Sequence, residues 1–160
     1  MADKAILTVA FCCVGAVIGY MFGSRLKKRS QYFADIDDFL RGFIGSLDCS
    51  MDTVPEIMAA HSSGSELLKN QLEACRKSIG NGTAPELAQG FLTKAEYALV
   101  NDTLSGLGKL SSDGERKNTE NKRRKLEEFG KRASEKYAKL GRPSVKLGFL
   151  AGLLVSVLCW

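Results

Sequence analysis

The chain has 160 residues, of which 44% are hydrophobic and 26% are charged, and its formal net charge is +5 at pH 7. A chain of this size and composition can bury one small core. Its single histidine and five scattered cysteines exclude a usual zinc site, because no CxxC pair is present.

The first predicted element is an uncharged, apolar segment from Ala5 to Gly23. Roughly 20 apolar residues are enough for a helix to cross a bilayer, so we predict a transmembrane helix over residues 5–23, preceded by a short extracytoplasmic N-terminus at residues 1–4. A cleaved signal peptide is the alternative. The basic cluster after the apolar run argues against cleavage, because it opposes translocation of the downstream chain; it comprises Arg25, Lys27, Lys28 and Arg29.

Between the two apolar ends of the chain, residues 24–146 predict a small bundle of about six helices. Apolar residues at three- and four-residue intervals indicate an amphipathic helix from about Gln31 to Cys49. Thr53 and Glu56 form a capping box that begins a short helix ending near His61. A third helix then presents an apolar face as far as Ile79, and the sequence Gly-Asn-Gly at 80–82 stops it.

Three further helix starts come later in the chain. Pro85 is predicted to open a short helix, and Thr93 with Glu96 forms a second capping box. A third box, Ser112 with Glu115, begins a long, basic final helix over residues 113–140. Because the first half of that helix is almost free of apolar residues, we predict that it projects from the bundle as a solvated arm. The Gly-Arg-Pro sequence at 141–143 then breaks the path.

The last apolar segment, Leu147 to Trp160, is predicted to be a C-terminal transmembrane helix, although it is short for a full crossing. A helix lying in the membrane interface is the alternative. Basic residues precede this segment as well, and loops rich in Lys and Arg stay in the cytoplasm. The sequence therefore predicts an all-α protein forming a multi-pass hairpin in the cell membrane, with both termini outside and residues 24–146 in the cytoplasm.

Two sets of residues are candidate interaction sites. Glycines four residues apart line both apolar segments, and such spacing allows close packing of helices in lipid; they are Gly15, Gly19 and Gly23 in the first segment and Gly148 and Gly152 in the second. The strongest charged run is Lys122, Arg123, Arg124 and Lys125. This basic face can be a solvated surface, or it can contact a protein or anionic lipid. Nucleic acid is less expected, because no aromatic residues interleave the run.

The sequence does not indicate an enzyme. His61 stands beside Ser62 and Ser63 at the end of a short predicted helix, where these residues are typical of a turn. There is no glycine-rich phosphate-binding motif. We therefore expect no catalytic residues, no metal and no cofactor.

The end of the chain carries a resemblance to a known family. The sequence from Lys146 to Leu154, KLGFLAGLL, resembles the closing segment of stage III sporulation protein AB of endospore-forming Firmicutes. The sequence Thr93 to Tyr97 resembles a helix start of that family, and Leu107-Gly108 shortly before Ser112 resembles its turn. The total length and the initial membrane segment with its basic stretch also agree.

This resemblance implies a non-enzymatic platform component of a sporulation-specific, secretion-like channel between mother cell and forespore. It implies a soluble domain similar to the helical domain of type II secretion F-type proteins, lying in the mother-cell cytoplasm. The implied partners are a sporulation secretion ATPase, other membrane components of the channel and membrane lipid, with no small-molecule substrate. A more basic last helix and the break at 141–143 depart from the family. The alternative function is a membrane-tethered regulator whose basic helix binds nucleic acid or anionic lipid.

Overall fold

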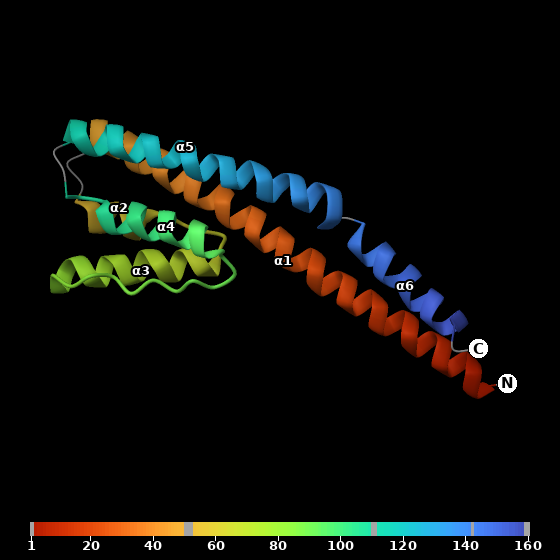
Figure 1. Cartoon of the computed structure of the whole chain (residues 1–160). Helices are drawn as coiled ribbons and strands as arrows, with labels where there is room; N and C mark the ends of the chain where they lie inside the picture. Colours follow the sequence, from red (N-terminus) through yellow and green to blue (C-terminus); the bar gives the residue numbers. More distant parts are fainter. Residues whose placement is uncertain (1, 50–52, 110–111, 142, 159–160) are drawn as a thin grey trace. The chain divides into compact units, whose positions relative to one another are not determined.

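The computed structural model describes the backbone of residues 2–49, 53–109, 112–141 and 143–158, and it leaves out the side chains of residues 1–8, 11, 48–52, 110–112, 142, 156 and 158–160. Within these ranges the structure is helical and contains no strand, which confirms the all-α prediction (Figure 1). The helices are α1 (Ala2–Cys49), α2 (Val54–Ala60), α3 (Glu66–Asn81), α4 (Lys94–Gly106), α5 (Ser112–Lys136) and α6 (Ser144–Leu158), with a π-helical turn, η1 (Tyr137–Gly141), after α5.

The chain forms two compact units. The first, which we call the helix-pair unit, consists of Met1–Ser30 and Arg132–Trp160. The second, which we call the bundle unit, is Gln31–Lys131. The two apolar ends of the chain therefore belong to one unit, and the predicted amphipathic helices belong to the other.

One continuous helix, α1, runs through the region where the sequence predicted two separate helices. The linking residues from Ser24 to Gln31 include no proline or glycine and are rich in Lys and Arg, which are good helix formers. Nothing in this stretch stops a helix. The C-terminal end of α1 at Cys49 agrees with the predicted end.

The core of the bundle unit is built on the predicted apolar face of α1. Its side chains recur at three- and four-residue intervals and are at most 2% exposed; they are Tyr32, Phe33, Ile36, Phe39, Leu40 and Phe43. Apolar residues of the other helices are buried as well, among them Leu68 and Leu72 of α3, Val100 and Leu104 of α4, and Leu126 of α5. Burial of these side chains supplies the main favourable contribution to folding.

The helix boundaries agree with the local signals in the sequence. The Thr53 and Thr93 N–H groups each donate to the Glu carboxylate three residues on, at 2.7 and 2.9 Å, so both capping boxes are confirmed. The third helix ends at Gly82, which adopts a left-handed φ of 66° and donates its N–H to the Ile79 carbonyl. The Ser112 side chain lies outside the described residues, so the third box stays a prediction.

The predicted short helix after Pro85 is wrong. The segment between α3 and α4 has no helix, and two of its carbonyl groups accept hydrogen bonds from side chains of the neighbouring helices. Gln71 Nε2 donates to the Ala88 carbonyl at 2.7 Å, and Tyr97 Oη donates to the Leu87 carbonyl at 2.9 Å. Gly90 then turns the chain with φ of 54°. Tertiary hydrogen bonds thus replace the local bonds that a helix would make.

The prediction that the first half of α5 is a solvated arm is also wrong. Glu115 is 2% exposed and Thr119 is 1% exposed, so this part of the helix packs within the bundle unit. Further along, Gly130 lies against the Phe33 side chain of α1. The first half of α5 therefore has a buried face even though that face is polar.

The predicted transmembrane helices at 5–23 and 147–160 are not supported among the described residues, where no helix is both long enough and apolar enough to cross a membrane.

Candidate functional site

The glycines predicted as a packing face meet one another in the helix-pair unit. The Gly15 backbone lies against the Gly148 carbonyl, and a Cβ atom added to Gly15 would be 3.3 Å from the Gly152 Cα. Gly19 lies against Ser144 and Val145 at the start of α6. Gly23, about one turn after Gly19, meets Gly141 and Ser144, so all five predicted glycines lie along one antiparallel helix–helix contact.

The turn before α6 allows this approach. Gly141 and Ser144 are both buried, and Ser144 Oγ donates to the Gly141 carbonyl at 2.7 Å. The Leu147 N–H then donates to the Pro143 carbonyl at 2.9 Å, which begins α6. The predicted break at 141–143 is confirmed, since α5 gives way to η1 and the chain restarts as a new helix.

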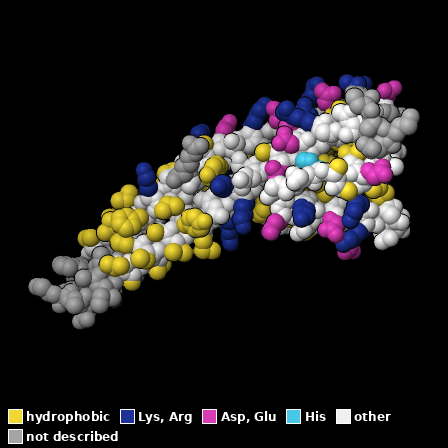
Figure 2. Space-filling view, turned by 180° about the vertical axis from the view of Figure 1, so that it is seen from behind, with side chains coloured by type: hydrophobic (Ala, Val, Ile, Leu, Met, Phe, Trp, Pro, Cys, Tyr) yellow, Lys and Arg dark blue, Asp and Glu magenta, His cyan; other side chains and the backbone are white. Residues whose placement is uncertain are grey.

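The outward surface of this helix pair carries many exposed apolar side chains. Figure 2 shows hydrophobic side chains gathered over this unit. Many large side chains of α1 and α6 are more than half exposed; they are Val9, Val14, Val17, Ile18, Tyr20, Met21, Phe22, Leu147, Leu150, Leu154 and Val157. Contiguous apolar surfaces of this kind mark contacts with a membrane or with another protein.

The basic run in α5 does not form a single exposed face. Lys122 Nζ lies 2.9 Å from Asp102 Oδ2 and also donates to the Asp102 carbonyl, and its side chain is 17% exposed. Arg123 Nη1 lies 2.9 Å from Asp37 Oδ1 of α1, and both side chains are less than one-fifth exposed. These two cations fasten α5 to α4 and α1. Arg124 and Lys125 remain on the exposed side of the helix.

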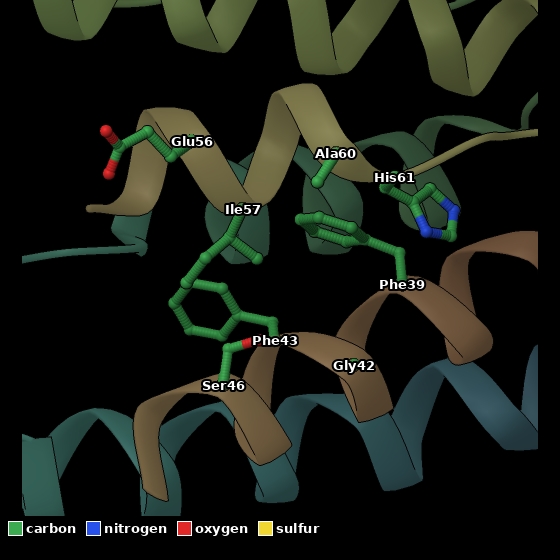
Figure 3. Close-up of a pocket in the computed structure, with 8 residues that line it drawn as sticks. All are labelled: Phe39, Gly42, Phe43, Ser46, Glu56, Ile57, Ala60 and His61. Carbon is green, nitrogen blue, oxygen red and sulfur yellow. The ribbon is translucent and has the colours of Figure 1, made fainter. Parts of the chain in front are cut away.

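A groove runs between α1 and α2 in the bundle unit (Figure 3). Phe39, Phe43 and Ile57 line it, and the His61 ring meets the Phe39 ring edge-on at 5.2 Å between centroids. His61 Nε2 is buried without a hydrogen-bond partner among the described residues. The Glu56 carboxylate lies at the other end of the groove and caps α2 (Figure 3). These polar groups do not converge on one point, as a nucleophile and its base must.

The described residues offer no site for a metal ion, since no three His, Cys, Asp or Glu side chains gather among them. A second pocket, of about 730 Å³, lies at the C-terminal ends of α3 and α4 and is lined by Cys75, Ile79 and Leu104. Burial raises the pKa of the Cys75 thiol to about 11. No local sequence signal marks either pocket, because each is formed by residues that are distant along the chain.

The comparisons with known proteins yield one family. The sequence pattern of stage III sporulation protein AB matches residues 4–160, which is nearly the full length of the chain. No curated protein and no solved structure matches.

Proposed function

The chain belongs to the stage III sporulation protein AB family, and we propose that it is a non-enzymatic platform component of a sporulation-specific, secretion-like channel. In this proposal the helix-pair unit is inserted in the cell membrane, and the bundle unit lies in the mother-cell cytoplasm. There it binds a secretion ATPase and other membrane components of the same channel. The role in sporulation comes from the family, and the remainder is inferred from the resemblance and the residues.

The observation that carries the proposal is the apolar surface of the helix-pair unit. Its two helices use glycine to bring their backbones together, so the large apolar side chains are left on the outside. In water this arrangement is unfavourable, because burying apolar surface yields about 25 cal/mol per Å². In a bilayer it is favourable, because lipid covers the outward side chains and close backbone contacts hold the helices together.

The sequence supports the same placement. The uncharged stretch from Ala5 to Gly23 includes side chains outside the described part of the chain, at positions 5–8 and 11. The whole stretch approaches the roughly 20 residues that a spanning helix requires. The segment from Leu147 onward is shorter, and Lys146 before it can extend its ammonium group toward the headgroups.

The bundle unit offers an exposed part of α5 for the ATPase. Arg124 and Lys125 are exposed, whereas Lys122 and Arg123 hold the helix in the fold. Reversing Arg124 and Lys125 to glutamate therefore tests docking and breaks only one exposed ion pair, between Arg124 and Glu120. We expect weaker co-purification with the ATPase, and unchanged co-purification would exclude this surface. The matched control reverses two exposed lysines of α3, Lys69 and Lys77.

The test of the membrane placement is a topology experiment in sporulating cells. Alkaline phosphatase and a fluorescent protein are fused in turn to the C-terminus and inserted in the Ser62–Gly64 turn between α2 and α3. Phosphatase is active only outside the cytoplasm, so we expect activity from the C-terminal fusion and fluorescence from the internal one. An active phosphatase at the internal site would place the bundle unit outside the cytoplasm and refute the proposed contact with an ATPase.

A further inference from the structure

Two basic clusters that are more than 100 residues apart in sequence belong to the same helix-pair unit. The two segments of this unit run antiparallel in a regular register: Gly15 faces Gly148, Gly19 faces Ser144 and Gly23 faces Gly141. Each residue forward along α1 therefore matches about one residue back along the facing segment. Continuing this antiparallel register from the glycine contacts brings Arg25 to about the level of Lys139. One turn further, Lys28 reaches about the level of Lys136.

The cationic side chains at these levels are exposed, and few acidic groups oppose them. Glu135 is the one acidic residue among the described side chains of the helix-pair unit. We call the exposed cations the basic collar; they are Arg25, Lys27, Lys28, Arg132, Lys136, Lys139 and Lys146. The collar begins directly where the exposed apolar surface of α1 ends, at Phe22.

We propose that the basic collar is a binding site for the phosphate headgroups of anionic phospholipids. This inference rests on the proposed membrane insertion of the helix-pair unit and deepens it by naming the class of lipid. The collar lies next to an apolar surface that lipid tails would cover, so a single phospholipid can satisfy both. A soluble phosphate would use only the charged part.

The arrangement also suits headgroups because both helical segments of the unit contribute cations. Arg25 and Lys28 belong to α1, whereas Lys136 and Lys139 belong to the α5–η1 side. Lys146 lies deeper, at about the level of Val17, and a long lysine side chain can extend from an apolar region to the headgroups. Anionic lipid bound on both sides would fix the depth of the helix pair in the membrane and neutralise the mutual repulsion of the cations.

The experiment compares the lipids that the full chain retains. The purified protein in neutral detergent is mixed with equal mole fractions of dioleoyl phosphatidylglycerol and dioleoyl phosphatidylcholine, and native mass spectrometry measures the ratio of the two bound lipids. The test variant replaces Arg25, Lys28 and Lys139 with glutamine. The matched control replaces three exposed lysines of the bundle unit, Lys69, Lys77 and Lys117, in the same way. Circular dichroism checks that both variants keep their helix content.

We expect the unsubstituted chain and the control to prefer phosphatidylglycerol. Each cation near an anionic surface is worth roughly fivefold in binding, so the triple variant should lose at least about tenfold of this preference. The preference should also fall with salt, since the Debye length shrinks from about 10 Å at 0.1 M to about 3 Å at 1 M. An excess of inorganic phosphate should leave the bound lipid in place.

Three outcomes would overturn the inference: no preference in the unsubstituted chain, an equal loss in the control, or displacement of the lipid by inorganic phosphate. A separate measurement distinguishes this failure from failure of the proposed function. The chain is reconstituted in vesicles of phosphatidylcholine alone and extracted with alkaline carbonate. Retention without a preference for anionic lipid would refute the collar and leave the membrane insertion standing. Release by carbonate would refute both.

Discussion

Substituting alanine for Gly19 should separate the two helices of the helix-pair unit. Gly19 is buried, and a Cβ atom added there would meet the Ser144 carbonyl oxygen, with the Ser144 carbonyl carbon at 3.0 Å and the Val145 Cα at 3.1 Å. All three neighbours are backbone atoms, so no side-chain rotation relieves the contact. The same α1 helix provides a control at Gly42, where an added Cβ has no neighbour within 4 Å among the described residues.

The two substitutions are therefore expected to act with opposite sign. Overpacking costs about 1–3 kcal/mol, and alanine recovers up to about 1 kcal/mol of helix propensity over glycine. At Gly19 the neighbours are backbone atoms, so the overpacking cost lies in the upper part of this range, at about 2–3 kcal/mol, and the net loss of stability of the helix pair is about 1–2 kcal/mol. At Gly42 only the gain in propensity remains, so this variant should be more stable by about 0.5–1 kcal/mol.

Hydrogen exchange of the full chain in neutral detergent, resolved by mass spectrometry, measures the loss of helix pairing at the amides of α6. A loss of about 1–2 kcal/mol corresponds to about 5- to 30-fold faster exchange of the amides of α6, since about 1.4 kcal/mol is a factor of ten. Gly42→Ala should leave α6 unchanged and slow exchange near its own position in α1. Unchanged α6 exchange in Gly19→Ala would refute the close glycine contact, and so would an equal effect in the control.

Three further predictions concern the bundle unit. Asp37→Asn removes the partner of Arg123 and of Arg41. Because Arg123 is then left mostly buried without its charge partner, the free energy of unfolding in urea should fall by about 1–3 kcal/mol. The control Glu127→Gln breaks the exposed pair with Lys131 and should leave the urea midpoint unchanged. Tyr32→Phe should cost about 1–3 kcal/mol, because it leaves Gln71 Oε1 of the buried bond at 2.6 Å without its donor. Burial holds the pKa of Tyr32 well above its ordinary value near 10, so the folded state keeps the proton that the unfolded chain loses. The contribution of Tyr32 to the free energy of unfolding should thus be fully present below about pH 10 and decline above it. Urea midpoints measured across pH should show a smaller decline in Tyr32→Phe. Finally, because burial raises the pKa of Cys75 to about 11, its thiolate at pH 8 is roughly 100-fold scarcer than that of an ordinary thiol. Mass spectrometry after alkylation should find Cys75 unmodified in the native chain and modified in urea; rapid native labelling would show that the site opens.

Local rules predicted the helix boundaries that depend on a few neighbouring residues. Thr53 with Glu56, and Thr93 with Glu96, needed only a three-residue spacing to mark a helix start. Gly82 ends α3 because glycine adopts the left-handed conformation at little cost. The buried face of α1 in the bundle unit is predicted by helical periodicity alone. In each case the information lies within about one or two turns of the chain.

The failures involve partners that are far away in sequence. The segment after Pro85 stays out of a helix because Gln71 and Tyr97 bind its carbonyl groups. The α5 helix packs against α1 in part because Arg123 forms an ion pair with Asp37, which is 86 residues away in sequence. A polar stretch predicts exposure only when its charges lack partners, and the sequence alone does not identify those partners.

The glycine faces lie between these two cases. Their spacing predicted close packing, but the sequence left open whether the partner is the same chain or another protein. The structure pairs Gly15 with Gly148 and Gly19 with Ser144, so the small-residue faces are occupied within one chain. Under the proposed function, a neighbour in the membrane would then approach the larger outward side chains, such as Ile18 and Leu150, which are more than half exposed. Contacts with the proposed channel partners would accordingly depend on the shapes of these side chains, and the glycines would act by holding the pair together.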